Sequence, residues 1–217
     1  MKKGLTEMVF ILDRSGSMSG LEKETIGGFN SLIEKQKKAE GSAIVSTVLF
    51  DGEIDVIHDR IALEKISGLT EKEYYARGCT ALLDAVGRSV RHIRKVHKNL
   101  PEEEKPEHTI VVITTDGYEN ASREYSLEKV KRLIIRQQEK HKWEFLFLGA
   151  NIDAVAAAGR IGIAANRAVR HKSDSRGTAL NYKVVAEAMC GMRCSAKQSI
   201  PDDWKAEIEE DVARRGV

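Results

Sequence analysis

The chain has 217 residues, which is enough for one domain with a sizeable hydrophobic core. Its 35 Lys and Arg residues nearly balance its 33 Asp and Glu residues, so the formal net charge is +2. This small charge argues against duplex DNA or an anionic membrane as the main partner, and a hydrophobic content of 41% is typical of an ordinary globular protein.

The first quarter of the chain predicts two buried strands, a helix and an edge strand. Residues 8–12 and 43–50 are nearly continuous apolar runs, as in strands that are covered on both faces. Residues 19–39 have apolar positions three and four apart, the pattern of an amphipathic helix. Asp51-Gly52 predicts a hairpin, so residues 53–59 should form a short antiparallel edge strand.

The rest of the chain alternates between the same two patterns. Helical spacing recurs in residues 81–98, 127–140 and 177–193, and apolar runs cover residues 109–114 and 144–150. A last short strand is expected around residues 163–170. In the tail, Trp204 and Ile208 lie four apart and could dock a short terminal helix. We therefore expect a three-layer α/β/α sandwich with right-handed crossovers in residues 1–195, followed by a tail in residues 196–217.

Features that bear on the cellular compartment are few. The apolar run before Asp13 is too short for a signal peptide, and no run approaches the length of a membrane span. The three cysteines are odd in number and have no C-x-x-C spacing, so a disulfide framework is not expected. These features favour a soluble, cytoplasmic protein.

Oxygen-bearing side chains follow two of the predicted strands and precede a helix. The stretch "DRSGSM" places Asp13, Ser15 and Ser17 directly behind the first strand, and Asp116-Gly117 ends the run "TIVVITTDG". Thr80 lies in a predicted loop before the helix in residues 81–98. Ligands in open α/β sheets bind beyond the carboxyl ends of the strands, so we expect these three loops to meet at one edge.

The five residues suit a small, hard cation. Mg²⁺ prefers six oxygen ligands in near-octahedral geometry and releases its waters reluctantly. Two carboxylates offset its charge, and three hydroxyls add lone pairs without charge. Because few protein oxygens would bind directly, one water position could be exchanged for an acidic side chain of another molecule. The sequence therefore predicts a bound cation with one coordination position open to a partner's carboxylate.

These motifs resemble the metal-ion-dependent adhesion site of the von Willebrand factor type A (vWA) domain. The resemblance rests on "DRSGSM", on Thr80 in "GCTALLDA" and on Asp116 in "TTDG", and it covers roughly residues 5–195. The run "FLGANIDA" is also similar to a run found after the fifth strand in bacterial members. The tail beyond about residue 196 lies outside the resemblance.

The resemblance implies a Rossmann-like fold with a mostly parallel six-stranded sheet in the order 3-2-1-4-5-6 and one antiparallel edge strand. It also implies Mg²⁺ or Mn²⁺ bound by Asp13, Ser15, Ser17, Thr80 and Asp116, and recognition of another protein. A bacterial intracellular adaptor that presents the metal to an Asp or Glu of its partner is the expected type.

Simpler interpretations exist for each motif by itself. Ser15 and Ser17 could cap the following helix, and Asp116-Gly117 could be a plain turn. Asp51 is explained by turn chemistry. Asp84 could hold a loop or be a solvated helix residue, and Asn120 could brace the Asp116 loop or cap a helix. A final group, Arg88, Arg91, Lys95 and Lys98, forms a basic stripe that is more simply a solvated face than a site for an acidic partner.

Two other function classes remain open. A Mg²⁺-dependent phosphohydrolase of the haloacid-dehalogenase type would need a second Asp as general acid where this chain has Ser15. No phosphate-binding G-x-x-x-x-G-K-[ST] loop and no G-x-S-x-G nucleophile elbow occurs. A vWA-fold scaffold that binds partners without metal is the third class. We expect a non-catalytic binding module.

Overall fold

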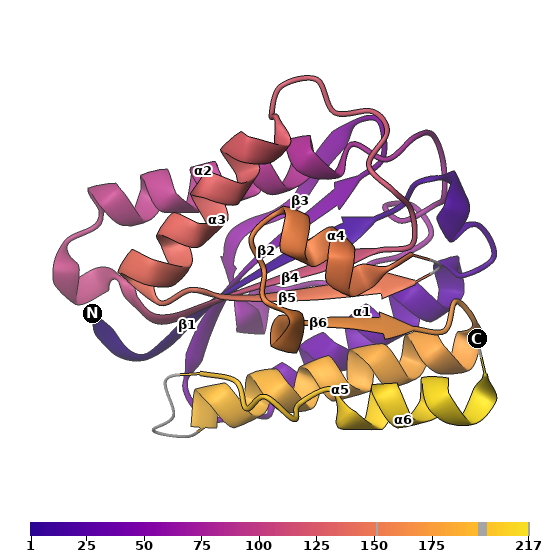
Figure 1. Ribbon diagram of the computed structural model, residues 1–217. Helices are drawn as coiled ribbons and strands as arrows, with labels where there is room; N and C mark the ends of the chain where they lie inside the picture. Colours follow the sequence, from indigo (N-terminus) through magenta and orange to yellow (C-terminus); the bar gives the residue numbers. More distant parts are fainter. Residues whose placement is uncertain (151, 195–198, 217) are drawn as a thin grey trace.

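Six strands form one sheet within residues 1–150, 152–194 and 199–216, the parts that this computed structural model describes (Figure 1). Their order is β3-β2-β1-β4-β5-β6, and β3 pairs with β2 in the antiparallel direction while all other neighbours are parallel. The expected strand order and antiparallel edge are therefore confirmed. The strands are β1 (Lys2–Asp13), β2 (Ser42–Phe50), β3 (Ile54–Ala62), β4 (Pro106–Thr115), β5 (Glu144–Ala150) and β6 (Ala168–His171).

Helices cover both faces of the sheet, which gives the predicted three layers (Figure 1). One face carries α1 (Glu22–Lys37), α5 (Ser175–Cys194) and α6 (Ala206–Arg215). The other carries α2 (Leu82–Asn99), α3 (Leu127–His141) and α4 (Ala154–Arg160). Each layer contributes apolar side chains to its own core cluster, so apolar residues cover both faces of the sheet between β2 and β5.

Strand β1 explains why its apolar run is continuous rather than alternating. Phe10 and its alternate neighbours pack toward the α1 and α5 layer, whereas Val9 and Ile11 pack toward α2 and α3. Because successive side chains of a strand point to opposite faces, a strand between two helix layers needs apolar residues at every position. Phe10 meets Phe29 of α1 edge to face at 5.3 Å between ring centroids. Burying a side chain of this size stabilises the fold by about 2 kcal/mol.

Besides strands that extend beyond the expected residues, as β1 does, three segments differ from the sequence-based expectation. The helix expected in residues 19–39 begins at Glu22, because Gly16–Met18 form a 3-10 turn first. The strand expected in residues 163–170 covers only Ala168–His171. The backbone N–H of Ile163 instead donates to the Ala158 carbonyl and closes α4, a short helix that we did not expect.

The C-terminal tail packs on the α/β core. Trp204 and Ile208 are buried in the core cluster of the α1 and α5 layer, and the Trp204 indole Nε1 donates to the Asn166 carbonyl at 2.9 Å. Helix α6 contacts α5 and β6. The terminal helix is therefore an integral part of this helix layer, although residues 195–198 of the predicted boundary lie outside the described residues.

The three cysteines are free thiols. Cys79 and Cys194 are exposed, and Cys190 is half-buried. Among the described residues, no helix combines the length and the apolar character that a membrane span needs.

Candidate metal-binding site

The candidate site lies where the strand order reverses. β1 and β4 are parallel neighbours, with Leu12 opposite Thr114, so both strands end at the same edge of the sheet. β1 ends at Asp13, and Asp116 follows the last residue of β4. This is the place at which open α/β sheets bind ligands. The two carboxylates are therefore positioned by neighbouring buried strands.

Hydrogen bonds connect the Asp13 loop with the end of β4. The Asp13 carboxylate accepts from the Ser15 backbone N–H at 2.7 Å and from the Thr115 hydroxyl at 2.5 Å. The Ser15 and Ser17 hydroxyl oxygens are 3.1 Å apart, and Ser17 Oγ donates to Asp116 Oδ1 at 2.5 Å. Four of the five expected ligands are therefore joined in one continuous chain of contacts.

Thr80 joins this group beside Gly117. A Cβ atom placed on Gly117 would lie 3.1 Å from Thr80 Oγ1, 3.2 Å from Ser17 Oγ and 3.9 Å from Ser15 Oγ. Three hydroxyl oxygens from two separate loops thus surround one point, and the absence of a side chain at Gly117 leaves that point open. The structure brings all five expected residues to one edge of the sheet.

Asn120 and Asp84, for which the sequence left two roles open, hold the neighbouring loops. The Asn120 side-chain oxygen accepts from the Thr80 N–H at 2.9 Å, and the Asn120 N–H donates to the Thr80 carbonyl at 3.0 Å. Asn120 therefore braces the Thr80 loop. Asp84 is buried, and its carboxylate accepts three backbone N–H bonds at 2.8–2.9 Å from residues 123–125. It is a loop-holding residue rather than a solvated one.

The interpretation of the two serines as helix caps is wrong. The α1 helix has Leu21 at its N-cap position, without a side-chain cap. Ser15 precedes the 3-10 turn but makes no capping bond with its side chain. The Ser17 hydroxyl instead donates to Asp116, and the Ser15 hydroxyl contacts that of Ser17.

Burial controls the charge of the two carboxylates. Asp13 is 1% exposed, and burial raises the pKa of Asp13 to about 6 against hydrogen bonds from Thr115 and Ser15 that lower it. Burial also raises the pKa of Asp116, although the Ser17 hydroxyl donates to it. Among the described residues, neither carboxylate has an ion-pair partner. The site therefore has negative charge without a matching cation from the protein.

The donor set fits a divalent cation of the oxygen-binding class. Asp116 Oδ2 is buried and has no hydrogen-bond partner among the described residues. Within those residues no cluster of three or more His, Cys, Asp or Glu is arranged to hold a metal. The fit thus depends on hydroxyls beside only two carboxylates, which is the hard-oxygen, low-charge set that Mg²⁺ accepts together with waters.

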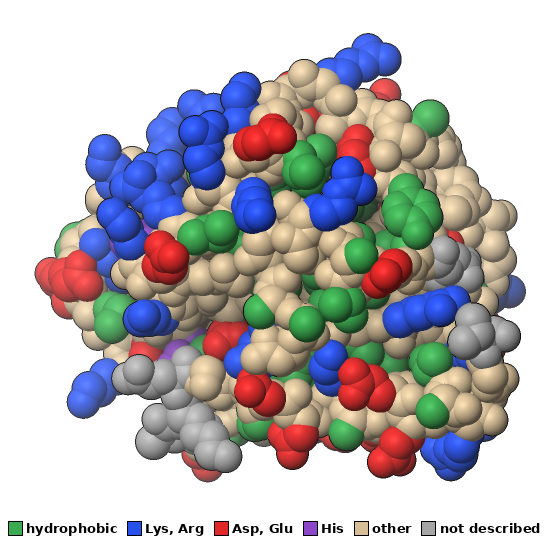
Figure 2. Space-filling model, in the orientation of Figure 1, with side chains coloured by type: hydrophobic (Ala, Val, Ile, Leu, Met, Phe, Trp, Pro, Cys, Tyr) green, Lys and Arg blue, Asp and Glu red, His purple; other side chains and the backbone are tan. Residues whose placement is uncertain are grey.

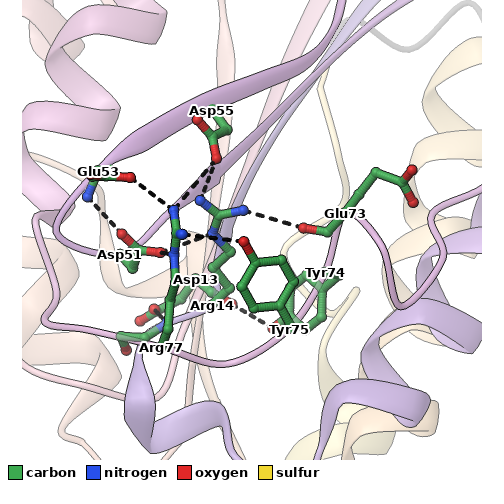
Figure 3. Close-up of polar contacts among 10 residues, drawn as sticks. Asp13, Arg14, Asp51, Glu53, Asp55, Glu73, Tyr74, Tyr75 and Arg77 are labelled. Carbon is green, nitrogen blue, oxygen red and sulfur yellow. Dashed lines mark hydrogen bonds and ion pairs between the residues drawn. The ribbon is translucent and has the colours of Figure 1, made fainter.

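An ion-pair network that the sequence did not predict lies behind the site (Figure 3). Arg14 is 2% exposed, and its Nε donates to Asp51 Oδ2 at 3.0 Å while its other nitrogens contact Asp55 and the Glu73 carbonyl. Arg77 Nε donates to the same Asp51 oxygen at 2.7 Å. The network joins the Asp13 loop, the β2–β3 hairpin and the segment before Thr80.

Turn chemistry alone does not explain Asp51. Its Oδ1 does accept from the Glu53 N–H at 2.6 Å, as a turn aspartate would. However, the side chain is buried between Arg14 and Arg77. Burial alone would raise the pKa of Asp51. The hydrogen bond from Arg77 and the charges of Arg14 and Arg77 nevertheless hold this pKa below its usual value.

Sequence analysis also missed two residues that support Asp13. The buried Tyr74 hydroxyl donates to the Asp13 carbonyl at 2.5 Å, and Thr115 donates to its carboxylate. Tyr74 lies 61 residues from Asp13 in a segment without helix or strand, so no pattern indicated it. Thr115 had one available signal, its position directly before Asp116 at the end of β4.

Comparisons with known proteins give a likeness of structure alone. No family model and no curated protein sequence matches the chain. A mussel byssus protein, proximal thread matrix protein 1 "with zinc occupied MIDAS motif", is 16% identical over 85% of this chain and 46% of its own, with a TM-score of 0.58. The vWF domain of the pilus tip protein Mfa5 from Porphyromonas gingivalis is 11% identical over 88% and 97%, with a TM-score of 0.57.

A von Willebrand factor type A protein from Catenulispora acidiphila is 16% identical over 86% of this chain and 43% of its own, with a TM-score of 0.57. The chain therefore spans less than half of the length of this protein and of the mussel protein. At these identities the likeness establishes the fold, which is that of vWA domains. The zinc in the mussel protein indicates that a domain of this fold can hold a divalent metal at a MIDAS motif.

Proposed function

We propose that this protein is a vWA-type binding module that captures an acidic side chain of a partner protein through a bound Mg²⁺ or Mn²⁺. Asp13, Ser15, Ser17, Thr80 and Asp116 would hold the ion. The observation that carries the proposal is that three hydroxyls meet two buried carboxylates, which form no ion pair within the described residues, at one strand-end edge of the sheet. The proposal depends on the chemistry of these five side chains and not on the names of the structurally similar proteins.

Charge determines what such an ion could bind. Two carboxylates offset the charge of a divalent cation, and the hydroxyls add no charge. The ion together with its protein ligands would therefore carry no net negative charge. When bound, the ion would supply an electrophilic position for an oxygen ligand from outside. A carboxylate is a hard oxygen ligand, and Asp and Glu are therefore the side chains that it would recognise best.

We propose a non-catalytic role, because in the described parts of the chain Ser15 and Ser17 hydrogen-bond to no general acid or base other than the two candidate ligands. We also propose that the protein acts in the bacterial cytoplasm. Its three free thiols support that location, since disulfides are rare in reducing compartments.

Affinity capture from the native cell tests the proposal. Tagged wild-type protein, Asp116→Ala and Asp203→Ala are compared in Mg²⁺ and in EDTA. Asp203 is exposed, lies just before α6 and is not in any loop that carries a candidate ligand, so its variant controls for the loss of a surface carboxylate. We expect a partner with wild type and Asp203→Ala in Mg²⁺ only, and none with Asp116→Ala.

The captured partner is then scanned for the acidic residue that it presents. One Asp or Glu whose change to Ala abolishes capture would support the proposal. Equal capture in EDTA, or by Asp116→Ala, would contradict metal-dependent recognition and favour a scaffold that works without metal. Phosphate release that needs Mg²⁺ and is lost in Asp13→Asn would favour a phosphohydrolase.

A further inference from the structure

A second concave site lies at the opposite edge of the sheet from Asp13 and Asp116. It has a volume of about 720 Å³ and is lined by the last turns of α2 and α3, by residues 106–109 at the start of β4, and by Trp143 before β5. Amino-terminal ends of parallel strands meet at this edge, whereas the candidate metal ligands follow carboxyl ends. The two sites are therefore separate.

Cations dominate the wall of this cavity. Lys105 is neutralised by Glu102 at 2.7 Å, and His97 contacts the buried Glu7 at 3.0 Å. Within the described part of the chain, five further cations of the lining form no ion pair with a carboxylate: Arg94, Lys98, Arg136, Lys140 and Lys142. They come from two helices and the turn after α3, so one concave wall gathers them from separate segments.

The whole helix layer is basic, although the chain is nearly neutral. α2 and α3 together carry ten Lys and Arg residues and three Asp and Glu residues, whereas the entire chain has a net charge of +2. The rest of the molecule is thus net negative. Figure 2 shows the Lys and Arg side chains gathered over these two helices at the upper left. A solvated face explains each basic residue of α2 by itself. It does not explain why the basic residues of the chain are concentrated on α2 and α3.

Helix C-termini explain part of the basic charge, but not all of it. Each carries about half a negative charge, so the ends of α2 and α3 would balance about one of the five cations. Glu107 also lines the cavity, and its carboxylate accepts from the Gly4 N–H at 2.7 Å. A positive excess remains. The pKa of His141 is consistent with this positive excess. It is lowered first by partial burial and then by the charges of Arg136, His97 and Lys105.

We propose that this cavity binds a small anion that carries two or more linked phosphate groups. Its volume lies within the usual range for small-ligand pockets, roughly 300–1,000 Å³. Arg94 and Arg136 offer planar forks that match phosphate oxygens, and the three lysines add point charges. A single phosphate would engage only part of this wall, whereas a chain of phosphates can reach cations on both helices. Nucleoside triphosphates and inorganic polyphosphate share this chemistry.

Isothermal titration in metal-free buffer at fixed ionic strength tests the site with tripolyphosphate, ATP and orthophosphate. We expect tripolyphosphate or ATP to bind at least about tenfold more tightly than orthophosphate. Arg136→Gln with Lys140→Gln should weaken that binding at least about tenfold. The matched control, Lys129→Gln with Arg132→Gln, removes the same charge from exposed positions of α3 outside the cavity and should bind as wild type.

The ratio of the two ligands identifies the source of the phosphates. Tighter binding of ATP assigns a nucleotide, and equal or tighter binding of tripolyphosphate assigns an inorganic chain. Absence of saturable heat with both ligands would overturn the proposal, as would equal weakening by the two double variants. Binding of single-stranded RNA without binding of either small ligand would overturn it in favour of a nucleic-acid surface.

Discussion

The Arg14 guanidinium donates to the Asp51 carboxylate at 3.0 Å, and both residues are only 2% exposed. Arg14 follows Asp13, while Asp51 begins the hairpin between β2 and β3 (Figure 3). The pair therefore connects the loop of the candidate metal ligands to the next strand of the sheet. The Arg14 guanidinium is taken up by Asp51, Asp55 and the Glu73 carbonyl, and among the described residues Asp13 and Asp116 form no ion pair.

We expect Arg14→Ala to lower the free energy of unfolding by about 3 kcal/mol, because it leaves buried Asp51 with less compensation. Urea unfolding measures the change. Arg88→Ala is the control, since Arg88 pairs with Glu124 in an exposed position and should change stability far less. Similar losses of stability in both variants would show that the buried Arg14–Asp51 pair contributes no more to the free energy of unfolding than an exposed pair does.

Gly117→Ala should weaken divalent-metal binding and leave the fold intact. The added methyl would lie 3.1 Å from Thr80 Oγ1 and 3.2 Å from Ser17 Oγ, in the space between the hydroxyls. Mn²⁺ titration followed by electron paramagnetic resonance checks this. Gly52→Ala is the matched control, because nothing lies within 4 Å of its Cβ position. Wild-type Mn²⁺ affinity in Gly117→Ala would mean that the ion binds elsewhere.

Metal affinity should fall as the pH is lowered through about 6, the pKa of Asp13 in the metal-free protein. Burial raises this pKa, so the proton competes with the metal below pH 6, whereas above it the carboxylate is already ionised. We expect a nearly constant affinity above pH 7 and a loss of roughly tenfold per pH unit below 6.

Mn²⁺ titrations between pH 5 and pH 8 measure this dependence. Thr115→Val provides the internal control, because it removes the hydroxyl that donates to Asp13 and lowers its pKa. Its curve should shift to higher pH. An affinity that does not change between pH 7 and pH 5 would contradict a metal-binding Asp13 that titrates near pH 6.

Trp204→Ala should destabilise the protein by about 3 kcal/mol, because it opens a cavity where α6 packs on the core. It also removes the donor to the Asn166 carbonyl. Thermal and urea unfolding measure the loss, with Val155→Ala as an exposed apolar control. An unchanged stability in Trp204→Ala would mean that the tail is not part of the folding unit.

The sheet could be predicted from the sequence because its central strands are buried on both faces. Continuous apolar runs such as residues 8–12 and 144–150 indicate that burial directly. Asp51-Gly52 indicated the antiparallel edge through its turn chemistry. Helix α4 was missed because its sequence, AVAAAGR, is mostly alanine and has no polar face from which to read a period.

The candidate ligands could be predicted because topology alone brings strand ends together. Asp13 and Asp116 each follow a buried strand, so the strand order was enough to make them neighbours. Arg14 could not be predicted, since a single Arg in a polar loop usually lies in solvent. Its burial depends on Asp51 and Asp55, which are 37 and 41 residues away.

The most direct test of the account is a crystal structure of the protein soaked in Mn²⁺, with anomalous scattering measured at the manganese edge. The account predicts one strong anomalous peak among the side-chain oxygens of Asp13, Ser15, Ser17, Thr80 and Asp116, and loss of that peak in Asp116→Ala. A peak at another place, or no peak at this edge of the sheet when the ion is in excess, would contradict it.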